Sequence, residues 1–431
     1  MAEQEYNHSN DFIKESVKQR PLDRKKLLRK TLTTAMMAVV FGTIACITFL
    51  VLEPLISKKI SQEEKPQVVY FREETDEMLP EEMVGEKNNS QSEAQSGEGA
   101  VAFPGIAMDK DGYGTMYASL ADFVQELKKY MVTVTGISSE INWLSNTEES
   151  RNQVSGMMLL DNGVELLVLT DASVLEGAET ILLTFYDASQ AEASVKGVDP
   201  QTDMAVLAVP LADLTLELRE NLYYPVLGSS NNPKMLGMPL IALGNPSGVQ
   251  DSIGYGMITS ASLMYSMPER NVKLIQTDIH GCEDPNGILF DLEGRVIGVL
   301  TDQKTPNKET VLTAYGITEL KRVLEKLSNG NKISFLGISG ISVTKEANVY
   351  NEVPLGAFIS DVVMDSPAMR AGVQKGDIIS EVNGRNITTF TDYTNMMMSL
   401  NPGDEVVMIV LRKNQGGYKE ITFTMQAGEV K

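Results

Sequence analysis

Two stretches of the sequence decide how the middle of the chain folds: LTDASVLEGAETILLTFYD, residues 169–187, and DPQTDMAVLAV, residues 199–209. Each contains a short apolar run, at residues 180–186 and 204–209, beside turn-forming residues such as Asp199-Pro200. Similar runs recur at residues 132–135, 165–170, 239–243, 273–277 and 295–300. Many short strands at nearly regular spacing favour an all-β barrel or sandwich over alternating strands and helices. The sequence therefore predicts a mainly β fold for residues 116–328.

Two helices are predicted within this region. Residues 119–130 place apolar side chains at helical spacing, so that Leu120, Phe123, Val124 and Leu127 share one face. Residues 319–327 show a similar pattern, and Gly330 just after them is a typical residue to end a helix.

The composition excludes several classes of function. Acidic residues outnumber basic ones by 58 to 37, which gives a net charge of −21. Such a surface repels a phosphate backbone, so nucleic acid is not an expected partner. The two cysteines, Cys46 and Cys282, cannot form a disulfide framework or a four-cysteine zinc site, and we expect no metal and no cofactor. Apart from His8 the only histidine is His280, so little general-base chemistry is available.

The N-terminal region predicts a membrane anchor. Residues 31–52 are uncharged and, at about 1.5 Å per residue, would span a bilayer core as a transmembrane helix. Residues 1–30 end in a strongly basic segment, which predicts a cytoplasmic tail and places the bulk of the chain outside a cell membrane crossed once. A cleaved signal peptide is the alternative, but the apolar run is longer than such peptides carry. Residues 53–115 read as an acidic, disordered linker in which only VVYF, residues 68–71, has the composition to order.

The C-terminal region, residues 333–428, reads as a separate small module. It contains FLGI at residues 335–338, SPAMRAGVQKGDIISEVNG at residues 366–384, a helical patch at residues 392–400 and two final strands at 405–411 and 420–424. The longer segment resembles the signature of PDZ domains, and FLGI resembles the loop with which they bind a peptide's terminal carboxylate. A PDZ domain is a small β-barrel with helices.

The middle region carries a second resemblance. The stretches quoted first, together with LGNPSG at residues 243–248 and the IQTD and GRVIGV segments at residues 275–278 and 294–299, are similar to the HtrA/Deg family of trypsin-like serine proteases. The order of the parts is also that of the family: an anchor, a protease domain of two β-barrels, then a PDZ domain. The resemblance covers residues 116–428. It implies a role in protein quality control in the bacterial envelope and, because the family commonly forms trimers, a homotrimer or a mixed trimer.

The positions that match the family's catalytic triad depart from its pattern. The family's histidine ends the motif TNNH, whereas this chain has Ser173 there, followed by VLEGA. The orienting aspartate is matched by Asp203, and the nucleophilic serine falls at Pro285 or, with a one-residue deletion, at Asn286. A serine hydroxyl is no base at neutral pH, and neither proline nor asparagine can attack. No catalytic site is therefore intact, which predicts a pseudoprotease.

Three alternatives stay open. The chain could be an endopeptidase with a non-standard nucleophile, for which Ser173 and Ser247 are the nearest candidates. His280 and Cys282 lie two residues apart and could form a catalytic pair, although neither falls at a triad position. The chain could also be a non-catalytic subunit that joins active relatives in a mixed trimer.

The resemblance to PDZ domains predicts a peptide-binding groove. The amides of Leu336, Gly337 and Ile338 would hold a terminal carboxylate, while a peptide adds as a strand to an open sheet edge. Phe335, Ile338 and the methionine run at 396–398, Met397 above all, would line the pocket for an apolar last residue. The expected partners are polypeptide C-termini or unfolded proteins.

Overall fold

The computed structural model describes residues 33, 35–39, 66–71, 110–141, 147–303 and 310–430. The chain divides into two units, Met1–Glu64 and Lys65–Lys431. In the first unit, Thr33 and residues 35–39 are helical, and the rest of the predicted membrane span, residues 31–52, lies outside the described residues. Across the part of the chain that is described, none of the helices combines the length and the apolar composition needed to cross a bilayer.

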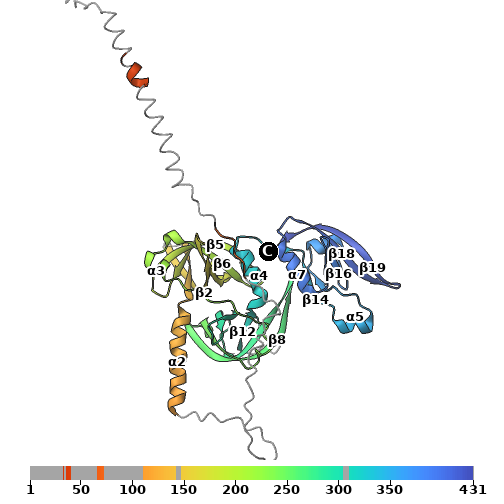
Figure 1. The fold of residues 1–431 in the computed structure, drawn as a ribbon, viewed down its shortest axis with the longest axis horizontal. Coiled ribbons are helices and arrows are strands. Elements are labelled where there is room, and N and C mark those ends of the chain that lie inside the picture. Colours follow the sequence, from red (N-terminus) through yellow and green to blue (C-terminus); the bar gives the residue numbers. More distant parts are fainter. Residues whose placement is uncertain are drawn as a thin grey trace, which may run out of the picture. The chain divides into compact units, whose positions relative to one another are not determined.

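The second unit begins with two closed β-barrels (Figure 1). The first, in the order β1-β2-β3-β6-β5-β4, consists of β1 Met131–Ile141, β2 Thr147–Asp161, β3 Glu165–Asp171, β4 Thr180–Thr184, β5 Gln190–Asp199 and β6 Met204–Pro210. The second, in the order β10-β11-β12-β9-β8-β7, consists of β7 Pro239–Asn245, β8 Ser252–Met267, β9 Arg270–His280, β10 Asn286–Phe290, β11 Val296–Thr301 and β12 Val311–Gly316. The predicted double barrel is confirmed.

Helices and short turns flank the barrels. They are α2 Lys110–Lys128, η1 Ala172–Leu175, η2 Leu211–Asp213, α3 Leu216–Glu220 and α4 Ile317–Ser328. The front helix was predicted for residues 119–130, but α2 begins at Lys110, within the stretch predicted as linker. Helix α4 follows its prediction: it buries Leu320, Val323 and Leu324, and Gly330 follows its end with a φ of +68°. That left-handed conformation is one that glycine adopts without strain.

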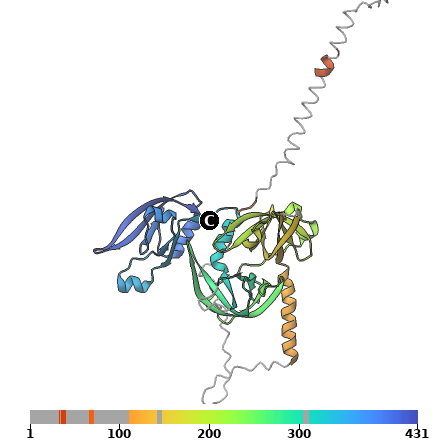
Figure 2. The same cartoon turned by 180° about the vertical axis from the view of Figure 1, so that it is seen from behind.

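The C-terminal module is a sheet with helices (Figure 2). Its elements are β13 Ser334–Phe335, β14 Ile338–Ser342, α5 Lys345–Asn351, β15 Ala357–Val362, α6 Pro367–Ala371, β16 Ile378–Val382, β17 Arg385–Asn386, α7 Phe390–Ser399, β18 Glu405–Asn414, β19 Gly417–Gln426 and β20 Gly428–Glu429. The sheet runs β14-β15-β16-β18-β19, so β14 is an edge strand, and α7 packs beside it. Within the hydrophobic core of this module, Leu336, Ile338 and Met397 are fully buried.

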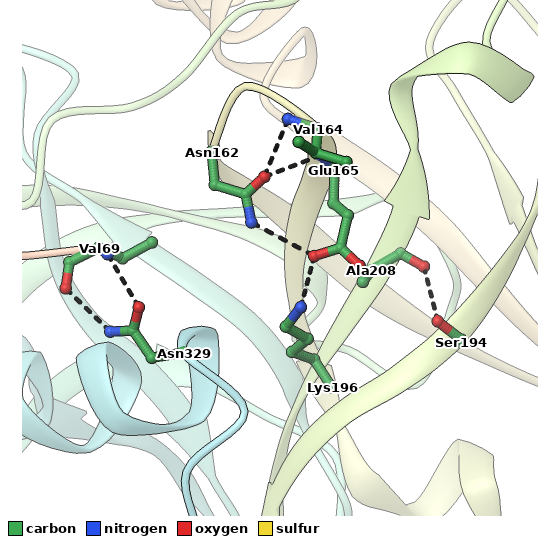
Figure 3. A network of polar contacts seen from close by, with 8 residues as sticks. All are labelled: Val69, Asn162, Val164, Glu165, Ser194, Lys196, Ala208 and Asn329. Atoms are coloured by element: carbon green, nitrogen blue, oxygen red, sulfur yellow. Dashed lines mark hydrogen bonds and ion pairs between the residues drawn. The ribbon is translucent and has the colours of Figure 1, made fainter. Parts of the chain in front are cut away.

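Residues 66–71 lie against the barrel unit, in the part of the linker for which the sequence indicated order. The Val69 amide donates to Asn329 Oδ1, and Asn329 Nδ2 donates to the Val69 carbonyl, both over 2.9 Å (Figure 3). The side chain of Val69 is 5% exposed and belongs to the barrel core. The backbone of this segment is thus tied at its centre to the end of α4.

Candidate functional site: a cleft and a groove

The triad positions predicted from the sequence come together in one cavity. Ser173 lies in η1 directly after β3, Asp203 lies in the turn between β5 and β6, and Pro285 and Asn286 lie at the start of β10. All four line a cavity of about 350 Å³. Ser247 is not among the residues that line it. The fold therefore brings together the four residues that the sequence aligns with the triad.

Ser173 takes no part in an acid–base pair. Its amide donates to Asp171 Oδ1 over 2.9 Å, and its carbonyl accepts from Asn152 Nδ2 over 3.1 Å. Among the hydrogen bonds of the described residues, none joins the Ser173 hydroxyl to the Asp203 carboxylate. A hydroxyl at this position cannot take up a proton at neutral pH, so Ser173 cannot serve as the base of a triad.

Asp203 lies among other acids. Burial raises the pKa of its carboxyl, and the negative charges of Asp171 and Asp302 add to the rise. Glu176 and Asp284 also line the cavity. A neighbouring imidazolium would instead favour the ionised form and lower the pKa. Across the described residues no group of three or more histidine, cysteine or acidic side chains is arranged to hold a metal ion.

The turn at the nucleophile position has a structural role. Asn286 Oδ1 accepts a hydrogen bond of 2.9 Å from the Ser155 amide, which joins the two barrels. Pro285 has no amide hydrogen, so it cannot donate to a developing oxyanion. Gly287 has a φ of +136°, and a Cβ there would lie 2.1 Å from the Leu243 carbonyl oxygen. The turn is therefore fixed by its contacts but offers no hydroxyl.

The possible His280–Cys282 pair is not assembled. His280 Nε2 lies 3.4 Å from the Thr310 hydroxyl, and Cys282 Sγ lies 3.7 Å from the Asn245 carbonyl oxygen. Neither residue lines the cavity of the triad positions.

The FLGI loop has the geometry predicted for a carboxylate site. The amides of Leu336, Gly337 and Ile338 converge on one oxygen, at distances of 2.8, 2.5 and 3.2 Å. Gly337 has a φ of +86°, and a Cβ there would lie 2.3 Å from the Cβ of Ser366. That oxygen is Oε1 of Glu269, at the turn between β8 and β9, which the sequence reasoning missed. In the sequence, only the two-residue turn Pro268-Glu269 could have indicated the β8–β9 hairpin.

The predicted pocket lining needs a correction. Met397 is buried in the core of the module together with Ile338, and Phe335 is half-buried in β13. The methionine that lines an open space is Met398, beside a cavity of about 490 Å³ between α7, the β8–β9 hairpin and α4. Met398 also packs against the barrel core. Unbranched methionine fills irregular gaps, which accounts for the different environments within one run.

Comparisons with known proteins agree with this architecture. Residues 154–299 match the trypsin-like peptidase domain family, and residues 358–413 match the PDZ domain family. A "Probable periplasmic serine endoprotease DegP-like" from Halomonas elongata is 30% identical over 288 residues, which are 65% of this chain and 57% of that protein. A "Putative serine protease HhoB" from Synechocystis sp. is 32% identical over 274 residues, 60% of this chain and 63% of that protein.

A solved structure, "HtrA-type protease AlgW with decapeptide", has a TM-score of 0.50 and 23% identity over 72% of this chain and 98% of that chain. At this identity the likeness shows the fold alone. The fold and the two sites thus define a trypsin-like double-barrel protein with a C-terminal PDZ domain. The chain carries a trypsin-like peptidase domain and a PDZ domain, and it is similar to serine endoproteases described as DegP-like. It spans 57% and 63% of the lengths of the two curated relatives.

Proposed function

We propose that this chain is a non-cleaving HtrA-family protein that binds unfolded or C-terminally exposed polypeptides on the outer side of a cell membrane. The observation that carries the proposal is the composition of the 350 Å³ cavity: its lining includes Ser173, Asp203 and the Pro285-Asn286 turn, which the sequence aligns with the triad, and it includes no histidine and no cysteine. The polypeptide-binding role is supported by the intact donors of the FLGI loop.

Binding would follow from backbone chemistry. The loop amides can donate to a peptide's terminal carboxylate, and β14 is an edge strand to which an extended peptide can add. Hydrogen bonds to a charged group are worth about 1.5–3 kcal/mol. Removing that charge by amidation should therefore weaken binding about ten- to a hundredfold.

Two assays on the full-length chain in detergent test the proposal. With unfolded casein and a fluorophosphonate probe, we expect no cleavage above buffer and no labelling. With a fluorescent peptide that ends in leucine, we expect fluorescence anisotropy to show a higher affinity for the free acid than for its amide. The amide is the matched control. Cleavage that disappears in Ser173→Ala or Ser247→Ala would refute the non-cleaving role. Equal affinity for acid and amide would refute the role of the loop.

The membrane anchor is part of the proposal. It rests on the apolar run at residues 31–52 and the basic segment before it. The relatives' printed description as periplasmic is consistent with an extracytoplasmic bulk. Protease added to cells whose outer layers have been removed should release a soluble fragment that begins within residues 57–115. A fragment released only after lysis would show the opposite orientation.

A further inference from the structure

The hairpin formed by β8 and β9 ends in an unusual turn. Met267 and Arg270 pair across it, so Pro268 and Glu269 alone connect the strands. Glu269 has a φ of +71°, a left-handed conformation that is uncommon for residues other than glycine. A type II turn, with proline first and a positive φ second, has this form and favours glycine at the second position. A glutamate held there indicates that its side chain has a role that a glycine could not fill.

The Glu269 carboxylate is enclosed by the PDZ domain. Its side chain is 1% exposed, and Oε1 accepts from all three amides of the FLGI loop while Oε2 accepts from the Tyr393 hydroxyl of α7. Burial raises the pKa of Glu269, although the bonds from Tyr393 and the three amides oppose the rise. Burial raises the pKa of Tyr393, and the neighbouring Glu269 carboxyl adds to the rise. The carboxyl group of Glu269 is thus held at a cost of desolvation, which its hydrogen bonds offset in part.

The backbone of the hairpin also bonds to the groove. The Glu269 amide donates to the Ile338 carbonyl over 2.8 Å, and the Thr394 hydroxyl of α7 donates to the Glu269 carbonyl over 2.8 Å. Two residues further along each strand, Asn271 Nδ2 donates to the Gly340 carbonyl over 2.9 Å. Successive outward carbonyls of the edge strand β14 are therefore occupied, as they would be by an added strand.

We propose that the β8–β9 hairpin is a tethered ligand of the PDZ domain, whose Glu269 carboxylate occupies the site of a peptide's C-terminal carboxylate. The inference rests on the proposed peptide-binding function and names its regulation. The three loop amides can bind only one carboxylate at a time. A peptide's terminal carboxylate can therefore bind there only after the hairpin has moved away. The hairpin thereby lowers the apparent affinity of the PDZ domain for its peptide partners.

The barrels hold the hairpin in place from the other side. Arg270 forms a buried ion pair with Asp199 at the end of β5, and Asp199 also accepts from the Thr202 hydroxyl. Arg270 and Asp199 are 2% and 0% exposed. Because the hairpin is covalently part of the chain and clamped at its base, its effective concentration at the loop is high. A free peptide therefore meets a reduced apparent affinity.

The test compares two glutamates with the same backbone conformation. Glu269→Gly removes the carboxylate and suits the positive φ. Glu352→Gly is the matched control, because Glu352 also has a positive φ, 54°, but is exposed at the end of α5. Both variants of the full-length chain, and the unmodified chain, are titrated into the leucine-ended fluorescent peptide. We expect Glu269→Gly to bind the free acid about ten- to a hundredfold more tightly, and Glu352→Gly to match the unmodified chain.

A second readout needs no peptide. Hydrogen–deuterium exchange of residues 336–338 should be faster in Glu269→Gly than in Glu352→Gly, since the amides lose their acceptor, and saturating free-acid peptide should slow it again. If Glu269→Gly does not fold, as judged by circular dichroism, Glu269→Gln serves instead. It keeps the size, removes the charge, and should shift both readouts in the same direction by less.

The outcomes separate the two claims. Unchanged exchange in Glu269→Gly would overturn the tethered ligand whatever the peptide does. Equal peptide affinity of the unmodified chain and Glu269→Gly would overturn it too, while leaving the binding function standing. Faster exchange in Glu269→Gly with no peptide binding by any variant would overturn the proposed function and, with it, the displacement by peptide.

Discussion

The triad cavity and the FLGI loop differ in the kind of group that each needs in order to act: side chains in the cavity and backbone amides in the loop. In the cavity, the backbone brings together Ser173, Asp203 and the Pro285-Asn286 turn, the residues that the sequence aligns with the family's triad, and none of them is a histidine or a cysteine. In the loop, all three amide donors are in place, but Glu269 fills the position of their ligand. The difference follows from what each site is made of. Side-chain chemistry is lost by many single substitutions, whereas a backbone donor persists through every substitution except proline and can otherwise be blocked by a competing acceptor.

The largest factor concerns the cavity, where a missing serine should withhold nearly all activity even after a histidine is introduced. Ser173→His restores a base beside Asp203, but the turn at β10 still lacks a hydroxyl, so we expect no cleavage of casein. In an enzyme whose triad acts as a unit, loss of the serine alone costs about 10⁶ in kcat. The measurement is casein hydrolysis against Ser173→Ala as control. Turnover by Ser173→His would mean that another nucleophile reaches the cavity.

The next effect concerns the buried ion pair between Arg270 and Asp199, which holds the β8–β9 hairpin at its base. Asp199→Asn leaves the buried Arg270 without its charge partner, and removing one member of a buried pair costs about 3–5 kcal/mol. We expect denaturant unfolding to show this loss, and peptide affinity to rise because the hairpin is less firmly held. Asp213→Asn, at an exposed aspartate in η2, is the control. A stability close to that of Asp213→Asn would show that the pair does not fix the hairpin.

The smallest effect is a pH dependence at the junction of α4 with the PDZ domain. Burial lowers the pKa of Lys326 from 10.5 to about 8, and its ammonium donates to the Leu400 carbonyl after α7. Between about pH 8 and 10.5 the unfolded chain still holds the proton that the folded chain has released, so stability should rise with pH in that window.

Lys326→Met should lack this rise and should exceed the unmodified chain in stability most clearly at pH 7. The unfolding midpoint in urea at pH 7 and pH 9.5 measures it, with the exposed Lys375→Met as control. An identical pH slope in Lys326→Met and the unmodified chain would assign the effect to other groups.

The sequence predicted strands such as β3 and β6, which form continuous apolar runs, and it missed strands such as β8, which do not. Strands β3 and β6 are buried along nearly their whole length, so their residues are apolar throughout. Strand β8 alternates exposed and buried residues over Ser252–Met267, and its many small polar residues resemble a loop. Alternation over a long, curved strand is a weak signal in composition alone.

The residues that line the cavity could be predicted as a group because a motif fixes each of them relative to a strand. Glu269 was missed because its partners lie 67 to 125 residues further along the chain, beyond any local pattern. Asp199 and Arg270 are likewise joined only by the folding of barrel and hairpin. Pairings of this kind depend on tertiary structure, which propensity and spacing do not encode.

The two-residue turn that carries Glu269 has a consequence for the rate at which a partner is bound. If the hairpin must leave before a peptide enters, the two events occur in sequence, and the slower one governs. The observed association rate then rises with peptide concentration only until it equals the rate at which the hairpin detaches. Beyond that point it levels off at a value that belongs to the chain and not to the peptide. Such a protein binds even an abundant partner no faster than its hairpin detaches from the PDZ domain.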